Sequence, residues 1–139
     1  MFNRRNARMT GEVFTNEEKE NMVEMLIDTL HSLVKEKQGN LKWKEKLKKI
    51  NFRINLEIID AGAVHLILKD GEYELAREKL PDPILEIKAT LENLFNFSSR
   101  QISSFSAIFL GKLKIKGKRH LRTLLNVGDV LRIIPESQL

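Results

Sequence analysis

Cysteine is absent from the 139 residues of this chain. Disulfides, zinc–thiolate sites, iron–sulfur clusters and cysteine nucleophiles are therefore excluded, and a cytoplasmic protein is the natural expectation. Long hydrophobic runs are absent too, because no window approaches the roughly 20 apolar residues that a membrane span needs. Arg4, Arg5 and Arg8 precede no apolar segment, so the sequence predicts neither a signal peptide nor a membrane anchor.

The chain has a formal net charge of +5 and a single tryptophan. Few aromatic residues therefore stand next to its lysines and arginines in the sequence. The positive excess lies mainly in two runs, Lys42–Arg53 and Lys112–Arg122. Proteins that read single-stranded nucleic acid interleave aromatic side chains with cations, and here only Trp43 does so. A nucleic-acid-binding module is therefore a weaker hypothesis than two solvated lysine-rich faces or an anion-binding surface.

A chain of this length is expected to bury one core rather than two. We expect a flexible basic N-terminus over residues 1–14 and a single domain over residues 15–139. Thr15 and Glu18 have the spacing of a capping box, which predicts a helix over residues 16–37. Its apolar residues follow a period of 3.6 and form one stripe: Val23, Leu26, Ile27, Leu30, Leu33 and Val34. The lysine-rich segment that follows is compatible with a short helix or with a lead-in to a strand.

Residues 51–76 are predicted to form a three-stranded meander. Apolar residues alternate with polar ones along the first strand: Phe52, Ile54, Leu56 and Ile58. This alternation indicates a half-buried antiparallel strand. Turn sequences at residues 60–62 and 70–71 separate it from two further strands, which we place at residues 63–69 and 72–76.

Pro81 and Pro83 end the meander, and a fourth strand with Ile87 pointing inward is expected after them. The remaining elements are predicted at residues 84–89 (strand), 90–95 and 101–110 (helices capped or bounded by polar residues), 112–117 (strand) and 121–134 (an apolar segment bent near Gly128). This order predicts an α+β domain, in which a largely antiparallel sheet has its helices gathered on one face.

Catalytic constellations are not evident in the sequence. His31, His65 and His120 lie on separate predicted elements without a neighbouring acidic or histidine motif, so none is assigned as a base or a metal ligand. We expect His31 to be solvated and His65 to be a hydrogen-bonded structural residue. There is no Gly-x-Ser-x-Gly motif, phosphate-binding loop or dinucleotide fingerprint. We therefore expect a protein that is not an enzyme and that carries no cofactor and no metal.

Near the C-terminus the run GKLKIKG, at residues 111–117, resembles a signature of the sterol carrier protein-2 (SCP-2) sterol-transfer family. Two upstream segments, NFRINLEIIDAGAVHLILKDGEYEL and ILEIKATLENLFNF, resemble the opening strands of that family and the passage from its fourth strand into helices. The resemblance covers roughly residues 20–134. The basic segment after Gly117 departs from the family pattern, and the last residues are not a Ser-Lys-Leu peroxisomal address.

The resemblance implies a five-stranded, largely antiparallel sheet, covered on one face by helices, that encloses an apolar tunnel for a fatty acid, fatty acyl-CoA, sterol or similar lipid. In that picture the strand residues Phe52, Ile54 and Leu56 form the floor. The walls would be Leu94, Phe95, Phe105, Ile108 and Phe109. A movable C-terminal lid would contain Leu121, Leu124, Leu125, Val130 and Leu131. Cationic residues that follow the wall residues in the sequence would attract an anionic headgroup: Lys112, Lys114, Lys116, Lys118, Arg119 and Arg122.

The function expected from this resemblance is non-catalytic binding or transfer of an intracellular lipid, with transient contact to an anionic membrane surface. An alternative is an accessory subunit that presents a lipid or quinone intermediate to a partner enzyme. A specific nucleic-acid partner is not expected. A purely structural explanation, in which the same apolar residues form an ordinary core, stays open at this point.

Overall fold

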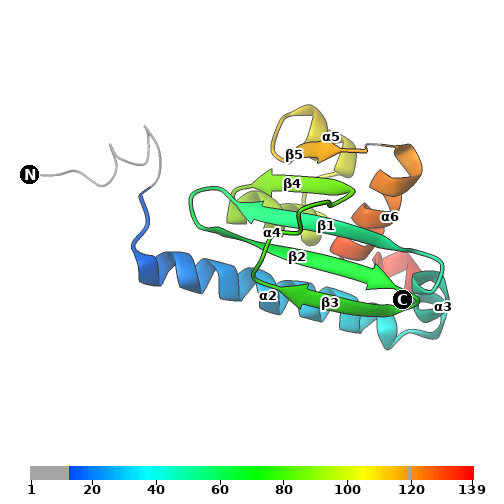
Figure 1. Cartoon of the computed structure of the whole chain (residues 1–139). Helices are drawn as coiled ribbons and strands as arrows, with labels where there is room; N and C mark the ends of the chain where they lie inside the picture. The colour runs from blue at the N-terminus through cyan, green and yellow to red at the C-terminus, as the bar shows by residue number, and fades with distance from the viewer. Residues whose placement is uncertain (1–12, 119) are drawn as a thin grey trace, which may run out of the picture.

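A computed structural model describes residues 13–118 and 120–139 of the chain. A five-stranded sheet with strand order β3-β2-β1-β4-β5 forms one layer, and helices cover one of its faces (Figure 1). The strands are β1 (Phe52–Ile58), β2 (Gly62–Lys69), β3 (Glu72–Ala76), β4 (Leu85–Ala89) and β5 (Lys114–Gly117). The helices are α2 (Asn16–Gln38), α3 (Leu41–Leu47), α4 (Leu91–Ser98), α5 (Ser104–Phe109) and α6 (Leu121–Leu131), and a 3-10 turn, η1 (Glu136–Gln138), follows. The predicted α+β layering is confirmed.

Helix α2 begins where the sequence predicts and ends one residue later than predicted, at Gln38. The Thr15 side chain accepts a hydrogen bond from the Glu18 backbone N–H, and the Glu18 carboxylate accepts one from the Thr15 backbone, so the capping box is formed. Gly39 caps the C-terminal end. Five members of the predicted stripe are buried: Val23, Leu26, Leu30, Leu33 and Val34. The helix packs over β2 and β3 and thus covers one half of the sheet.

The meander β1–β2–β3 is confirmed, with turns that require the residues present. Asp70 and Gly71 both have positive φ angles, of 54° and 84°, as a two-residue type I′ hairpin turn demands. Asp60 also has a positive φ angle, of 61°, in the preceding turn. Strand β3 spans the predicted residues 72–76, and β1 pairs antiparallel with β2 through seven residues.

The sheet contains one parallel pair, which the sequence did not predict. Strand β4 pairs parallel with β1 instead of extending the meander beyond β3. The connection must therefore cross β2 and β1, and residues 77–83, called the strap below, do so on the face opposite the helices. Asn55 exchanges two hydrogen bonds with the Leu80 backbone, of 2.8 and 3.0 Å. These bonds explain why Asn55, although polar, is buried.

The second half of the chain agrees with the predicted order but not with all its boundaries. Helix α4 continues to Ser98, and α5 begins at Ser104 rather than near residue 101, because the Ser103 hydroxyl accepts a hydrogen bond from the Ser106 backbone N–H and caps it. Helix α6 runs uninterrupted past Gly128, where a bend was expected.

The lysine-rich segment after α2 is the short helix α3. Asn40 caps it, and Trp43 is buried beneath Lys46, whose ammonium group lies 4.2 Å from the centre of the indole ring. The only tryptophan of the chain is therefore part of the core and is not available to stack on a base. This removes the aromatic support for the nucleic-acid hypothesis.

Candidate functional site

The predicted floor lies on the helix-covered face of the sheet. Phe52, Ile54 and Leu56 are buried in the main hydrophobic core, and their cross-strand partners are apolar as well. Leu94, from the first turns of α4, joins the same core. The even-numbered residues of β1 therefore form the apolar centre of the sheet. Strands β2 and β3, which α2 covers, lie on one side of β1, and β4 and β5 lie on the other.

The predicted walls separate into two groups. Leu94 and Phe95 of α4 face the interior or its margin, whereas Phe105, Ile108 and Phe109 of α5 are exposed on the outer surface. Their exposure corrects the prediction that these three residues surround the interior. The reason is geometric: α5 has six residues, and the small side chain of Ala107 is the one through which it joins the core.

The predicted lid is anchored at one end and free at the other. Val130 and Leu131 are core residues, Leu124 packs at its edge, and Leu121 and Leu125 are exposed. The segment Arg132–Ile134, called the C-terminal clamp below, fixes the C-terminal end of α6 by backbone and side-chain hydrogen bonds. Of the predicted lid, only the N-terminal half of α6 is therefore free of these restraints.

The C-terminal clamp joins α2 to α4. The Ile134 backbone N–H donates to the Glu36 carboxylate at 2.7 Å, and the Ile133 N–H donates to the Ser98 carbonyl at 2.9 Å. Arg132 donates from Nε to the Phe97 carbonyl at 3.0 Å and from Nη2 to the Ile102 carbonyl at 2.9 Å. The two helices thus lie on either side of the clamp.

Helix periodicity shows which side of α2 is turned toward α4. Positions 22, 25, 29 and 36 share one side of the helix, and Glu36 on that side bonds the clamp. The opposite side faces β3, since His31 Nδ1 lies 2.6 Å from the Tyr73 hydroxyl. Met22 is half-buried and Met25 is 49% exposed. Two methionines therefore form the α2 side of an apolar margin.

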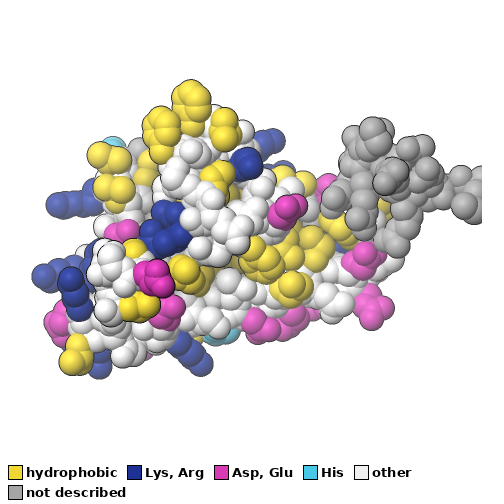
Figure 2. Space-filling model, turned by 180° about the vertical axis from the view of Figure 1, so that it is seen from behind, with side chains coloured by type: hydrophobic (Ala, Val, Ile, Leu, Met, Phe, Trp, Pro, Cys, Tyr) yellow, Lys and Arg dark blue, Asp and Glu magenta, His cyan; other side chains and the backbone are white. Residues whose placement is uncertain are grey.

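The opposite margin comes from α4, where positions 91, 95 and 98 share a face and Ser98 bonds the clamp. Leu91 and Phe95 on this face are half-buried. We call the strip between Met22 and Met25 on α2 and Leu91 and Phe95 on α4 the apolar seam. Figure 2 shows hydrophobic side chains lying open along the helical face, between α2 and the helices above it.

Met22 and Leu91, one on each side of the apolar seam, are partly buried and pack against the hydrophobic core. The C-terminal clamp bonds both helices at Glu36 and Ser98. Methionine side chains are unbranched and adapt to irregular apolar partners, so one wall can reshape around a chain-like ligand. Met22 and Met25 were not among the predicted site residues, because they flank the core stripe of α2 rather than belonging to it. Their identity as methionines was the available signal.

The predicted headgroup cations lie at the other edge of the molecule. Lys114 and Lys116 belong to the edge strand β5, opposite Lys88 and Glu86 of β4. Lys112 and Lys118 flank this strand, and Arg122 lies in the first turn of α6, all of them exposed. Arg119 lies outside the described residues. The structure therefore groups these cations with α5 and α6 rather than with the apolar seam.

The histidines stay apart from each other. His65 is buried and lies within hydrogen-bond distance of the Glu78 carbonyl and the Glu74 carboxylate, at 2.6 and 2.8 Å, so the expected structural role is confirmed. His31 is partly buried rather than fully solvated as expected, with its ring edge against Tyr73 and its Nδ1 2.6 Å from the Tyr73 hydroxyl. Within the described ranges 13–118 and 120–139, no group of His, Asp and Glu could hold a metal ion, and no helix is long and apolar enough to cross a membrane.

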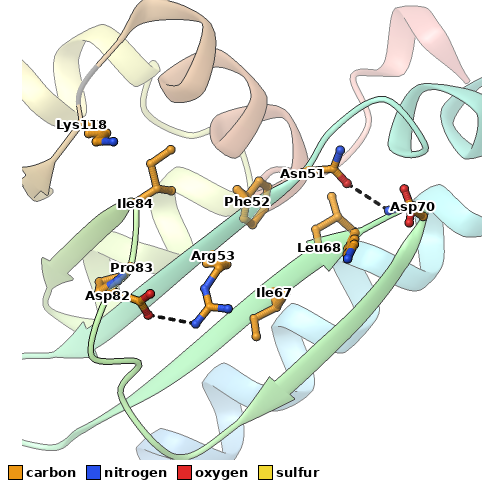
Figure 3. A pocket seen from close by; sticks show the side chains of 11 residues that line it. Asn51, Phe52, Arg53, Ile67, Leu68, Asp70, Asp82, Pro83, Ile84 and Lys118 are labelled. Carbon is orange, nitrogen blue, oxygen red and sulfur yellow. Dashed lines mark hydrogen bonds and ion pairs between the residues drawn. The ribbon is translucent and has the colours of Figure 1, made fainter.

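A cavity of about 800 Å³ lies at the end of the strap, on the face opposite the helices (Figure 3). Ile67, Pro83 and Ile84 contribute apolar surface, while Arg53 donates to Asp82 at 3.0 Å across its rim. It is open to solvent, and an ion pair spans it. This cavity was not predictable from the sequence, because it depends on where the strap crosses β1.

Comparison with known proteins agrees with this architecture. The SCP-2 sterol transfer family matches residues 30–127. The fold is similar to a structure described as UbiJ-SCP2 ubiquinone synthesis protein, with 14% identity, a TM-score of 0.60 and coverage of 73% of this chain and 87% of that one. It is also similar to apo sterol carrier protein 2 from Yarrowia lipolytica, with 17% identity, a TM-score of 0.54 and coverage of 76% and 86%.

The same fold recurs within a longer enzyme. The stereoselective inverting sec-alkylsulfatase Pisa1 from Pseudomonas sp. is 19% identical, with a TM-score of 0.57, and the match covers 66% of this chain but 14% of that chain. Comparison with curated protein sequences finds no match. The family match extends over more than half of the chain and contains the meander, α4, α5 and the GKLKIKG run. The chain belongs to the SCP-2 sterol transfer family.

Proposed function

We propose that this domain binds a lipid in the apolar seam, with the hydrocarbon part against the centre of β1 and between α2 and α4. The observation that carries the proposal is the seam itself: the partly buried Met22 and Leu91 pack against the core from two helices that the C-terminal clamp joins. Membership of the SCP-2 sterol transfer family supports a lipid as the ligand. Fatty acids, fatty acyl-CoA and sterols are the classes to test.

The energetics favour this use of the seam. Burial of an aliphatic chain stabilises a complex by roughly 0.8 kcal/mol per CH2 group, so partial burial of a long chain offsets the cost of association. Met25, which is 49% exposed, gains apolar contacts when a chain lies beside it. Lipid uptake in the seam requires rearrangement of methionine side chains but no change in the clamp.

Met25→Glu is expected to weaken binding of a fluorescent fatty acid by about tenfold or more, because a carboxylate beside a hydrocarbon chain loses its hydration. The variant should still fold, since the Met25 side chain is about half exposed to solvent. Fluorescence titration measures the affinity. Met25→Leu is expected to keep binding near the level of the unchanged protein.

Leu41→Glu is the matched control, because it likewise replaces an apolar side chain by a carboxylate, at an 86% exposed position on α3. It should leave fatty-acid affinity unchanged. Equal affinity for Met25→Glu and Leu41→Glu would contradict the placement of the lipid in the seam. Circular dichroism melts of the variants separate loss of the site from loss of the fold.

An accessory role beside a partner enzyme is compatible with the likeness to the UbiJ-SCP2 ubiquinone synthesis protein. At 14% identity that likeness shows the fold alone, so it adds an isoprenoid quinone to the ligands worth testing and nothing more. The seam is an open strip rather than a short closed pocket, and a linear isoprenoid chain presents the same chemistry to it as an acyl chain.

A further inference from the structure

Helix α5 presents large apolar side chains to solvent. Phe105 and Phe109 are 74% and 77% exposed, and their rings stack on each other at a centroid distance of 5.5 Å. Leu110, directly after the helix, is 64% exposed. Exposed apolar groups of this size are commonly interaction sites when they gather on one surface. These residues contact no other element of the described chain that would bury them.

The segment is held firmly enough to display these residues. Ser103 caps the helix, and Ala107 anchors it in the core. The Leu113 backbone N–H donates to the Ala107 carbonyl at 3.0 Å, which fixes the chain as it leaves the helix. The apolar face of α5 is therefore part of the folded structure rather than a frayed end.

The first turns of α6 extend the same surface. Leu121 and Leu125 are 72% and 56% exposed and lie one helical turn apart. Helix α5, strand β5 and the start of α6 lie at the same end of the molecule (Figure 1). We call this surface the α5–α6 tip and define it by its exposed apolar residues: Phe105, Ile108, Phe109, Leu110, Leu121 and Leu125.

Cations border the α5–α6 tip. Lys112 follows α5 after Leu110 and Gly111, Lys116 lies on the adjacent strand β5, and Lys118 and Arg122 lie on the path into α6. Among the residues of the described ranges, no carboxylate forms an ion pair with any of these four side chains. Figure 2 shows hydrophobic side chains projecting at this end of the molecule with Lys and Arg side chains on either side of them.

We propose that the α5–α6 tip docks onto an anionic membrane surface, with Phe105, Phe109 and Leu110 inserted at the interface and the bordering cations on phospholipid headgroups. Aromatic and aliphatic side chains on one face, with lysines at its margin, are the composition that interfacial helices use. Each lysine near an anionic leaflet strengthens binding, and the net positive border supplies the required charge complementarity. This inference goes beyond lipid binding in the seam, because it concerns a different surface.

The test is cosedimentation of the full chain with vesicles. The protein should bind vesicles of phosphatidylcholine and phosphatidylserine, bind pure phosphatidylcholine vesicles far more weakly, and be released from the mixed vesicles by added salt. Phe105→Ser combined with Phe109→Ser should lower the vesicle partition constant by about tenfold or more, because two inserted rings are lost. Thermal melts should be unchanged, since both rings are exposed.

Matched controls distinguish the tip from general surface properties. Leu41→Ser removes an equally exposed apolar residue on α3 and should leave vesicle binding unchanged. The double variant Lys112→Gln/Lys116→Gln should lower the partition constant by about tenfold. The double variant Lys42→Gln/Lys49→Gln removes the same charge from the segment around α3. It should change the partition constant by less than about twofold.

Three results would overturn the proposal: equal binding to both vesicle types, equal losses in the two pairs of lysine variants, or vesicle binding that is unaffected by the paired phenylalanine substitutions. Light scattering tests whether the protein is a dimer. If the two phenylalanine substitutions turn a dimer into a monomer and leave vesicle binding unchanged, the tip is a self-association surface instead. Fatty-acid titration of the same variants keeps the two proposals separate, because the seam residues are untouched in all of them.

Discussion

Gly117→Ala is expected to lower the free energy of unfolding by more than about 3 kcal/mol, although it adds a single methyl group. A Cβ atom at this position would lie 2.3 Å from the Ile84 carbonyl oxygen and 3.1 Å from Leu85 Cα. Both contacts are with backbone, which cannot rotate away as a side chain does. Gly117 also has a φ angle of +114°, which an alanine rarely adopts.

The clash would act on the pairing of β4 with β5. Gly117 is opposite Leu85 in this antiparallel pair, and the next residue, Lys118, donates its backbone N–H to the Ile84 carbonyl at 2.9 Å. Strand β5 has no partner on its other side in the described sheet, so it has little else to hold it. Loss of this pairing would release the path from α5 to α6.

Gly111→Ala is the matched control, because Gly111 has a positive φ angle of +72° but nothing within 4 Å of its would-be Cβ atom. It should cost only the backbone strain, about 1–2 kcal/mol. Urea denaturation of the two variants measures the difference directly. If Gly117→Ala proves no more destabilising than Gly111→Ala, the close approach of β5 to Ile84 is not present in solution.

The stability of the protein is expected to rise with pH between about 8 and 10, by up to about 3 kcal/mol, through Lys37. This side chain is completely buried; it donates to the Leu33 carbonyl at 3.1 Å and to the Arg132 carbonyl at 2.6 Å. Burial lowers the pKa of Lys37 from 10.5 to about 8, while Glu36 and Asp129 raise it and Arg100 lowers it further.

The direction of the effect follows from proton binding. The unfolded chain keeps the Lys37 proton up to about pH 10.5, whereas the folded chain releases it near pH 8, so the unfolded state holds more protons between these values. The cost of burying the charge is therefore present in full below pH 8 and is lost as the pH rises toward 10.5. Stability increases over that window.

Lys37→Met should flatten this part of the stability profile, because it removes the titrating group. Urea denaturation at several pH values from 7 to about 10 measures the slope for each protein. Lys35→Met is the control, since Lys35 is exposed on the same helix and should leave the slope unchanged. A slope that persists in Lys37→Met would assign the pH dependence to other groups.

The order of elements was predictable because each depends on signals a few residues apart. Capping residues set the starts of α2 and α4, and the Asp70-Gly71 turn sets the β2–β3 hairpin. The parallel pairing of β4 with β1 was not predictable, since it depends on a strap held by Asn55 through a contact 25 residues away in sequence. The alternation of apolar and polar residues along β1 indicates that one face of the strand is covered. It does not indicate which strands pair with β1 on its two sides.

The candidate site was predicted less completely than the fold. The apolar residues of β1 were correctly placed on the covered face, because alternation fixes the face of a strand. The resemblance to the SCP-2 family placed Phe105 and Phe109 in the walls of a tunnel, yet both are exposed on α5, where Ala107 is the buried residue. Met22 and Met25 were not assigned because periodicity identifies the buried stripe of a helix but not the helix that lies beside its margin.

Native mass spectrometry of protein purified without detergent, followed by organic extraction of the released material, is the most direct test of whether the domain binds a lipid. We expect a discrete added mass on the chain and, in the extract, one or a few lipids with a hydrocarbon chain long enough to occupy the apolar seam. A bare chain that also fails to displace a fluorescent fatty acid would contradict it, and the seam would then be only the edge of an ordinary core.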